Sequence, residues 1–229
     1  MSEVIGMLGY GMIRTIFWIL VTVLLLRFTI LRKKKLYKIL TVIVCIVGLN
    51  TLSAQFPIEN LFFSFKSPES AFQYYHGGKM IGNIVEVVEG KSSSMVVFIE
   101  DNSFIGRTFI TLKTEKGFKI PSWFTVEKHT RNLNERKYGP FIVDITIYRV
   151  VDANDYFYYG SISTKEDNIT ITDSNHVNVK NFYRDSDNTD ISTIIFYGYI
   201  ENLTGEYYFL IGDQKVSIDE QLKPGYNEK

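Results

Sequence analysis

The densest group of metal-binding side chain types in the sequence is an acidic segment near residue 188. Asp185, Asp187, Asn188 and Asp190 supply carboxylate and amide oxygens, which are the ligands that hard cations such as Ca²⁺ prefer. The EF-hand order is not followed, because Asp190 stands where glycine is needed and Phe196 where the closing glutamate belongs. We therefore expect a solvated loop and no cofactor, with a Ca²⁺ site as the alternative interpretation.

Other groups of catalytic residue types are not found at recognised spacings. His76, His129 and His176 are far apart, and none belongs to a pair at the spacing of a zinc site. Cys45 is the only cysteine, so the chain beyond it has no disulfide and no thiol nucleophile. We expect a non-enzymatic protein; the alternative is a metal-assisted hydrolase of envelope material that uses the segment 185–190.

Tyrosines gather in candidate strands of the C-terminal half. In a strand, rings two residues apart share a face, and neighbouring strands place such rings side by side. An exposed row of rings can bind a sugar or a peptide, whereas in the interior the same rings fill a β core. The core is the simpler interpretation. The candidate binding surface consists of Tyr156, Tyr158, Tyr159, Tyr197 and Tyr199.

Two apolar runs precede these candidate sites. The first covers about residues 12–31, and the second, about residues 39–56, contains no charged residue. Each is long enough for a helix to cross the hydrocarbon core of a bilayer, which needs roughly 20 residues. Lys and Arg in short loops stay on the cytoplasmic side, and the basic segment 32–38 lies between the runs. We therefore predict a transmembrane hairpin in residues 1–56, with its turn inside and both of its ends outside.

Two details of the apolar runs have alternative interpretations. Arg14 is near the outer end of the first run, so we expect its side chain to reach the polar interface; the alternative is a buried ion pair or a residue of an ion path. The second run resembles a signal peptide with a cleavage site at Ala54. Because a signal peptide stands at the start of a chain, we favour an uncleaved hairpin.

Charge is distributed unevenly along the chain. Of the 25 basic residues, seven precede Phe56, where Glu3 is the only acid, which leaves a net charge of −6 for residues 57–229. An acidic surface does not suit nucleic acid, whose phosphates need basic residues. We expect the lipid bilayer and a protein or cell-envelope partner instead. The frequent Ile, Lys, Asn and Tyr are typical of a bacterium with an AT-rich genome.

The region beyond the hairpin begins with a short helix. Ser67 is a helix cap, Pro68 suits the first helical position, and the glycines at 77–78 end the helix. Alternating apolar residues then predict a four-stranded antiparallel sheet, so that residues 57–128 form one lobe. Its predicted strands cover residues 80–88, 95–100, 105–112 and 118–126. The polar stretch 128–138 reads as a linker.

The remaining sequence predicts a β-sandwich-like lobe over residues 137–219, followed by a polar tail at 220–229. Turn residues recur about every ten positions, which is typical of short sandwich strands. The stretch 191–200 is apolar on both faces, so we place it centrally. The expected fold class is an α+β membrane protein. Its expected function is a membrane-anchored, extracytoplasmic binding or assembly module, or alternatively an accessory subunit of a multi-spanning membrane complex.

Overall fold

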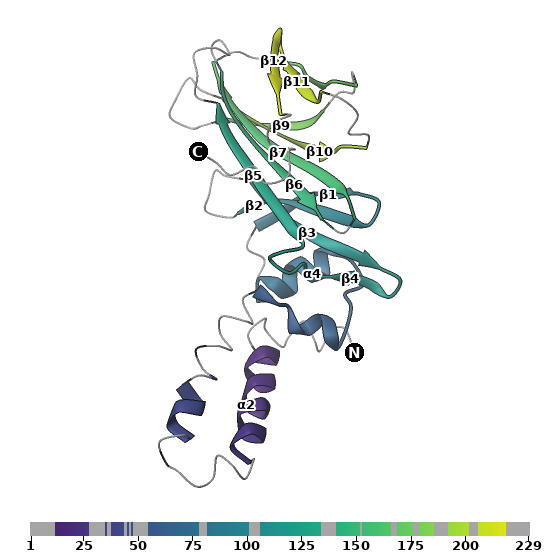
Figure 1. Ribbon diagram of the computed structural model, residues 1–229. Helices are drawn as coiled ribbons and strands as arrows, with labels where there is room; N and C mark the ends of the chain where they lie inside the picture. Colours follow the sequence, from purple (N-terminus) through teal and green to yellow (C-terminus); the bar gives the residue numbers. More distant parts are fainter. Residues whose placement is uncertain are drawn as a thin grey trace.

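The computed structural model consists mainly of antiparallel β sheets with few helices, as predicted. Helix α2 (Met12–Arg27) projects from the end of the β layers where helix α4 (Pro68–Tyr75) and strand β4 (Gly117–Lys119) lie (Figure 1). The structure describes residues 12–27, 35, 38–43, 45, 47, 55–77, 82–100, 106–133, 141–151, 153–165, 169–175, 179–185, 192–201 and 206–218. For residues 131–133 and 183–185 it describes the backbone but not the side chains.

The first sheet, sheet A, is a four-stranded antiparallel meander next to α4. Its order is β1 (Gly82–Glu89), β2 (Ser93–Glu100), β3 (Gly106–Thr114) and β4. Helix α4 begins as the sequence predicts, because Ser67 Oγ accepts from the Ser70 amide at 3.2 Å and Ser70 Oγ accepts from the Ser67 amide at 3.1 Å. The helix and the two hairpins, β1–β2 and β3–β4, agree with the prediction for this region; the pairing of β2 with β3 joins them into one sheet.

Two further sheets contain the rest of the described strands, and all their pairs are antiparallel. Sheet B has the order β5 (Val126–Leu133), β6 (Ile142–Val150), β7 (Asp155–Thr164), β10 (Ser192–Tyr199) and β9 (Lys180–Asp185). Sheet C has the order β12 (Gln214–Ser217), β11 (Tyr208–Ile211) and β8 (Ile171–Asp173). The apolar stretch that we expected to be central is β10, which has a neighbour on each side.

Sheet B is the middle layer of the β region. Its side chains on one face, such as Ile145 and Phe196, pack with Phe209 of sheet C. Those on its other face, such as Phe157, pack with Met95 of sheet A. On the far side of sheet A, Phe72 of α4 packs against β2. The layers are therefore α4, sheet A, sheet B and sheet C, with an apolar core in each gap.

One predicted boundary differs from the structure. Residues 126–133 are strand β5, which pairs with β6 from Val126–Val150 to Leu133–Val143, although we expected a linker at 128–138. Strand β5 lies at the edge of sheet B, with a neighbour on one side only, and edge strands tolerate charged residues. Its polar sequence therefore resembles that of a linker. The predicted strand 118–126 stops at Lys119, because Pro121 has no amide to donate to a ladder. The division into two lobes stays a prediction.

Among the described residues, no helix combines the length and the apolarity that crossing a membrane requires, and α2 has 16 residues. The end of the first predicted span, 28–31, lies outside the described residues. So does much of the second, 39–56, of which only 39–43, 45, 47, 55 and 56 are described. The predicted tail at 220–229 is also outside them.

Candidate functional sites

The acidic segment gives no described metal site. Asp187, Asn188 and Asp190 lie outside the described residues, and Asp185 ends β9 with a side chain that is not described. In the described part of the chain, no group of three or more His, Cys, Asp and Glu residues is arranged to hold a metal ion. A Ca²⁺ site in this segment stays a prediction.

The five predicted tyrosines are divided between the two faces of sheet B. Tyr158 is buried in the core shared with sheet C, where Tyr156 is half-buried at the margin. Tyr197 is buried in the core shared with sheet A, where Tyr159 and Tyr199 are half-buried. They do not form one exposed row, because both faces of sheet B are covered. Binding by these tyrosines stays a prediction, and Tyr156 is the best placed of them to meet a ligand.

Two of these tyrosines place their hydroxyl groups against carboxylates of the A–B interface. Tyr197 donates to Glu86 Oε2 at 3.0 Å, and Tyr199 donates to Asp155 Oδ1 at 2.9 Å. Burial and the hydrogen bond to a carboxylate each raise the pKa of these phenols, to about 12 in both cases. Lys180 also pairs with Glu86. The Glu86 contacts tie β1 to β9 and β10, and the Tyr199–Asp155 hydrogen bond links β10 to β7, so both tyrosines have a structural role.

Asp155 holds the β1–β2 turn against sheet B. Its fully buried carboxylate accepts from the amides of Lys91 (3.3 Å) and Ser92 (2.8 Å), from Ser93 Oγ (2.7 Å) and from the Tyr199 hydroxyl. Burial alone would raise the pKa of Asp155, but these hydrogen bonds outweigh it and lower the pKa. Four donors from the β1–β2 turn and from β10 converge on this carboxylate, so Asp155 acts as a structural clamp between the turn and sheet B.

A second buried carboxylate, Asp173, closes the B–C core. It accepts from the Tyr207 hydroxyl at 2.7 Å and from the Asn175 amide at 2.9 Å. Burial, together with this hydrogen bond, raises the pKa of Tyr207. Burial also raises the pKa of Tyr158, with a smaller effect of the charge on Asp173. These rings stay neutral at ordinary pH and serve as fixed donors or packing groups.

A buried ion pair joins α2 to the connector that follows the apolar region. Arg14 Nε lies 2.6 Å from Glu59 Oε1, and Arg14 Nη2 lies 3.2 Å from Glu59 Oε2. Glu59 is in the 3₁₀ helix η2 (Ile58–Leu61), and Tyr74 of α4 donates to its Oε1 at 3.4 Å. Arg14 is 8% exposed and Glu59 is fully buried. The structure thus forms the buried pair that we had kept as the alternative.

The sequence carries one signal for this pairing. Glu59 is the only acidic residue between Glu3 and Glu69, so it is the natural counter-charge for a basic residue that enters an apolar region. Sequence alone could not show that the connector folds back onto α2. Asn60 fixes that fold: its side chain amide donates to the Ile120 carbonyl at 2.7 Å and accepts from the Ile120 amide at 3.2 Å.

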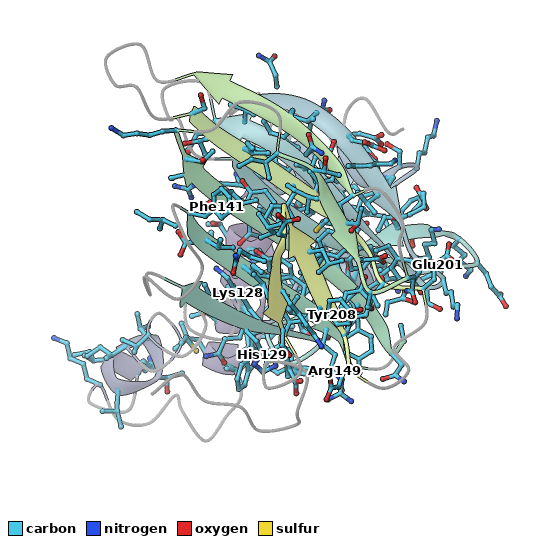
Figure 2. The ribbon with its side chains drawn as sticks, turned by 90° about the horizontal axis from the view of Figure 1, so that it is seen from above. Lys128, His129, Phe141, Arg149, Glu201 and Tyr208 are labelled. Carbon is cyan, nitrogen blue, oxygen red and sulfur yellow. The ribbon has the colours of Figure 1, made fainter. Side chains whose placement is uncertain are left out.

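The polar row, defined here as Glu127, Arg149 and Tyr156, crosses β5, β6 and β7. Glu127 pairs in register with Arg149, which pairs with Tyr156. Arg149 Nη1 lies 3.4 Å from Glu127 Oε2, His129 Nε2 lies 3.7 Å from the same oxygen, and the guanidinium lies 6.0 Å from the Tyr156 ring centroid. Figure 2 labels His129 and Arg149 among the side chains of these strands.

Arg149 supplies the cationic group of the polar row. Its Nε is buried and has no hydrogen-bond partner among the described residues, although its side chain is 22% exposed. A guanidinium beside an aromatic ring suits a carboxylate, a peptide carbonyl or a sugar hydroxyl. Sequence reasoning included Tyr156 but missed Arg149 and Glu127, because cross-strand register is not visible in the sequence.

Comparisons with protein-family models, with curated proteins and with solved structures find no match to this chain. Its function is therefore inferred from its own contacts. Two of them point beyond fold stability: the ion pair between α2 and η2, and the polar row on sheet B.

Proposed function

We propose that the chain is a membrane-anchored, non-enzymatic binding or assembly module of the cell envelope. Residues 1–56 anchor it as a helical hairpin, and the β sheets stand on the outer face of the membrane. The observation that carries this proposal is the buried pair of Arg14 and Glu59, which joins the apolar helix α2 to the base of the β region. A simple tether would need no such junction.

The exposed apolar side chains of α2 indicate that this helix lies in an apolar environment. Ile16, Leu20 and Leu24 on one stripe, and Ile19 and Val23 beside it, are each at least half exposed. Contiguous exposed apolar surface of this kind marks a membrane or a protein partner. The apolar run of the sequence also continues past the described end of α2, to Leu31. A multi-spanning partner whose helices pack against α2 is the second candidate surrounding.

The uneven distribution of charge along the chain supports the proposed orientation in the membrane. The basic segment 32–38 would stay in the cytoplasm, whereas residues 57–229, with a net charge of −6, would lie outside. The polar row is the proposed contact for a ligand, because the partly exposed guanidinium of Arg149 lies beside the half-buried ring of Tyr156. A peptide or a sugar of the envelope fits that chemistry.

The test uses the full chain in a bacterial host, with a reporter that is active only outside the cytoplasm fused after Lys229. We expect an active reporter and a protein that stays in the membrane pellet after alkaline carbonate washing. In the control, glutamine replaces Lys33, Lys34 and Lys35, which should produce mixed orientations. A chain released by carbonate, or a reporter active only in the cytoplasm, would overturn the proposal.

A further inference from the structure

The turn between β4 and β5 displays two large aromatic side chains. Ser122 and Thr125 close this turn, with their hydroxyl oxygens 2.6 Å apart and the Thr125 amide donating to the Ser122 carbonyl at 2.9 Å. Between them, Trp123 is 65% exposed and Phe124 is 53% exposed. The closed turn holds both rings out from the sheet, although burying them would be favourable.

The connector that leaves the apolar region adds more exposed apolar side chains beside this turn. The Trp123 amide donates to the Gln55 carbonyl at 3.3 Å, and the Phe56 and Phe124 rings lie 5.5 Å apart. Leu61 is 76% exposed. We call this set the apolar base; its members are Phe56, Leu61, Phe62, Trp123 and Phe124.

The apolar base carries no free charge. Within residues 55–65 and 120–126 the only charged residue is Glu59, which is fully buried and paired with Arg14. In the described β region, the other exposed large apolar side chains belong to separate elements: Tyr75 to α4, Val85 to β1 and Ile142 to β6. Exposed apolar surface is thus gathered at one end of the molecule.

That end is the one from which α2 projects (Figure 1). Phe62 of the apolar base lies 6.1 Å, between ring centroids, from Phe17 of α2, and the Arg14–Glu59 pair fixes the same junction. A surface that continues an apolar helix, has no free charge and ends in Trp and Phe rings matches the interface between lipid headgroups and acyl chains, where tryptophan is enriched.

We infer that the apolar base rests in the headgroup region of the bilayer that holds α2, with Trp123 and Phe124 inserted as a lipid-contacting tip. This inference rests on the membrane anchor proposed above. It adds that the β region lies against the lipid surface instead of standing clear of it on a flexible stalk.

The two tryptophans of the chain, Trp18 in α2 and Trp123 in the turn, allow the anchor and the contact to be tested separately. Full-length W18F leaves Trp123 as the only tryptophan, and W123F leaves Trp18. Each variant is reconstituted at low density into phosphatidylcholine vesicles whose acyl chains carry bromine near the headgroup. Tryptophan emission is then measured with these lipids and with aqueous iodide as quenchers.

We expect brominated lipid to quench Trp123 by a fraction comparable to that for Trp18. Iodide should quench Trp123 several-fold less than a tryptophan placed on the exposed β6 position by I142W, in a chain carrying W18F and W123F as well. Emission from Trp123 should lie at a shorter wavelength than emission from the I142W control. No other protein is present, so a partner cannot produce this result.

Three outcomes would overturn the inference. If lipid quenches Trp18 but Trp123 behaves like the I142W control, the anchor stands and the contact is wrong. If lipid quenches neither tryptophan, the anchor itself is wrong. If Trp123 is shielded from iodide only at high protein density and is not quenched by lipid, the base is covered by a second copy of the chain.

Discussion

Arg14 and Glu59 are 45 residues apart in sequence, yet their side chains form two hydrogen bonds inside the protein, at 2.6 and 3.2 Å. Removing one charge of a buried pair destabilises a protein far more than replacing both residues with apolar ones, because the remaining charge is still desolvated but no longer has a partner. This asymmetry makes the junction testable.

Glu59→Gln should lower the free energy of unfolding by about 3–5 kcal/mol, the usual cost of breaking a buried ion pair. Replacing both residues with methionine should cost much less, because no buried charge remains. Thermal and chemical unfolding of the full chain in detergent micelles measures both effects. Glu115→Gln, at the exposed turn between β3 and β4, is the matched control and should change little.

Equal destabilisation by Glu59→Gln and by the double replacement would contradict this account. It would mean that the volume of the two side chains, and not their charge, holds α2 to η2.

Asp155 should make the stability of the fold depend on pH in the acid range. Its pKa in the folded state lies below its usual value of 3.8, so its stabilisation is complete above that value and is lost as the pH falls through the lower, folded-state pKa. Asp155→Asn should cost about 1.5–3 kcal/mol at neutral pH, the range for hydrogen bonds to a charged group. Urea unfolding over a pH series measures this.

In the same pH series, Asp155→Asn should show a flatter acid limb than the unaltered chain. Asp213→Asn, on the exposed turn between β11 and β12, is the control and should keep the original slope. An Asp155→Asn curve parallel to the original would show that the carboxylate is not the titrating clamp.

Tyrosines 156 and 158 differ by two positions on one strand but should respond differently to truncation. Tyr158 is buried against Phe209, with 4.9 Å between ring centroids, so Tyr158→Ala should cost about 3–5 kcal/mol. Tyr156→Ser should cost much less, because Tyr156 lies at the margin of this core. If the polar row binds a ligand, Tyr156→Ser and Arg149→Gln should weaken that binding while the melting temperature stays nearly constant.

Binding is best measured by pull-down of envelope peptides and glycans with the full chain in nanodiscs. Lys128→Gln, on β5 beside the row, is the control for a general loss of positive charge. Unchanged capture by Arg149→Gln would remove the polar row as a ligand contact.

Gly160 is a position where the close approach of β7 to its neighbours excludes a side chain. A Cβ there would overlap Phe196 Cζ and lie 2.8 Å from the Asp144 carbonyl oxygen. Gly160→Ala should therefore cost about 1–3 kcal/mol through overpacking. Phe196→Leu in the same chain should recover part of that cost, which a double-mutant cycle detects. Ser163→Ala on the same strand is the control; strictly additive effects would contradict the overlap.

Local signals in the sequence were sufficient for sheet A and α4. Ser67, Pro68 and the two apolar runs that flank the polar turn at 90–94 act within a few residues, so capping and hairpin pairing follow from neighbours in the chain. Strand β5 was missed because its polar residues suit an edge, where alternation is weak. The antiparallel β class was therefore predictable, whereas the edge of sheet B was not.

The arrangement of the sheets depended on contacts that no local pattern reveals. The alternation of Tyr156 to Tyr159 correctly implies two faces, but it cannot say that sheet A covers one and sheet C the other. Glu59 likewise reads as a connector residue until the chain folds back to Arg14. The covering of sheet B and the Arg14–Glu59 pair were not predicted for the same physical reason. Packing between segments far apart in the sequence decides which surfaces are covered, and local sequence patterns do not reveal that packing.

Strands β7 and β10 pair with each other along their lengths inside a sheet that lies between two others. Each has a hydrogen-bonded neighbour on both sides and is covered on both faces, so their amide hydrogens should exchange with deuterium most slowly. Strands β8 and β9 lie between them in the chain, and their pairing must close that long loop before its contacts give any stability. The kinetic barrier to folding should therefore lie at the formation of this pair, while the hairpins of sheet A form early.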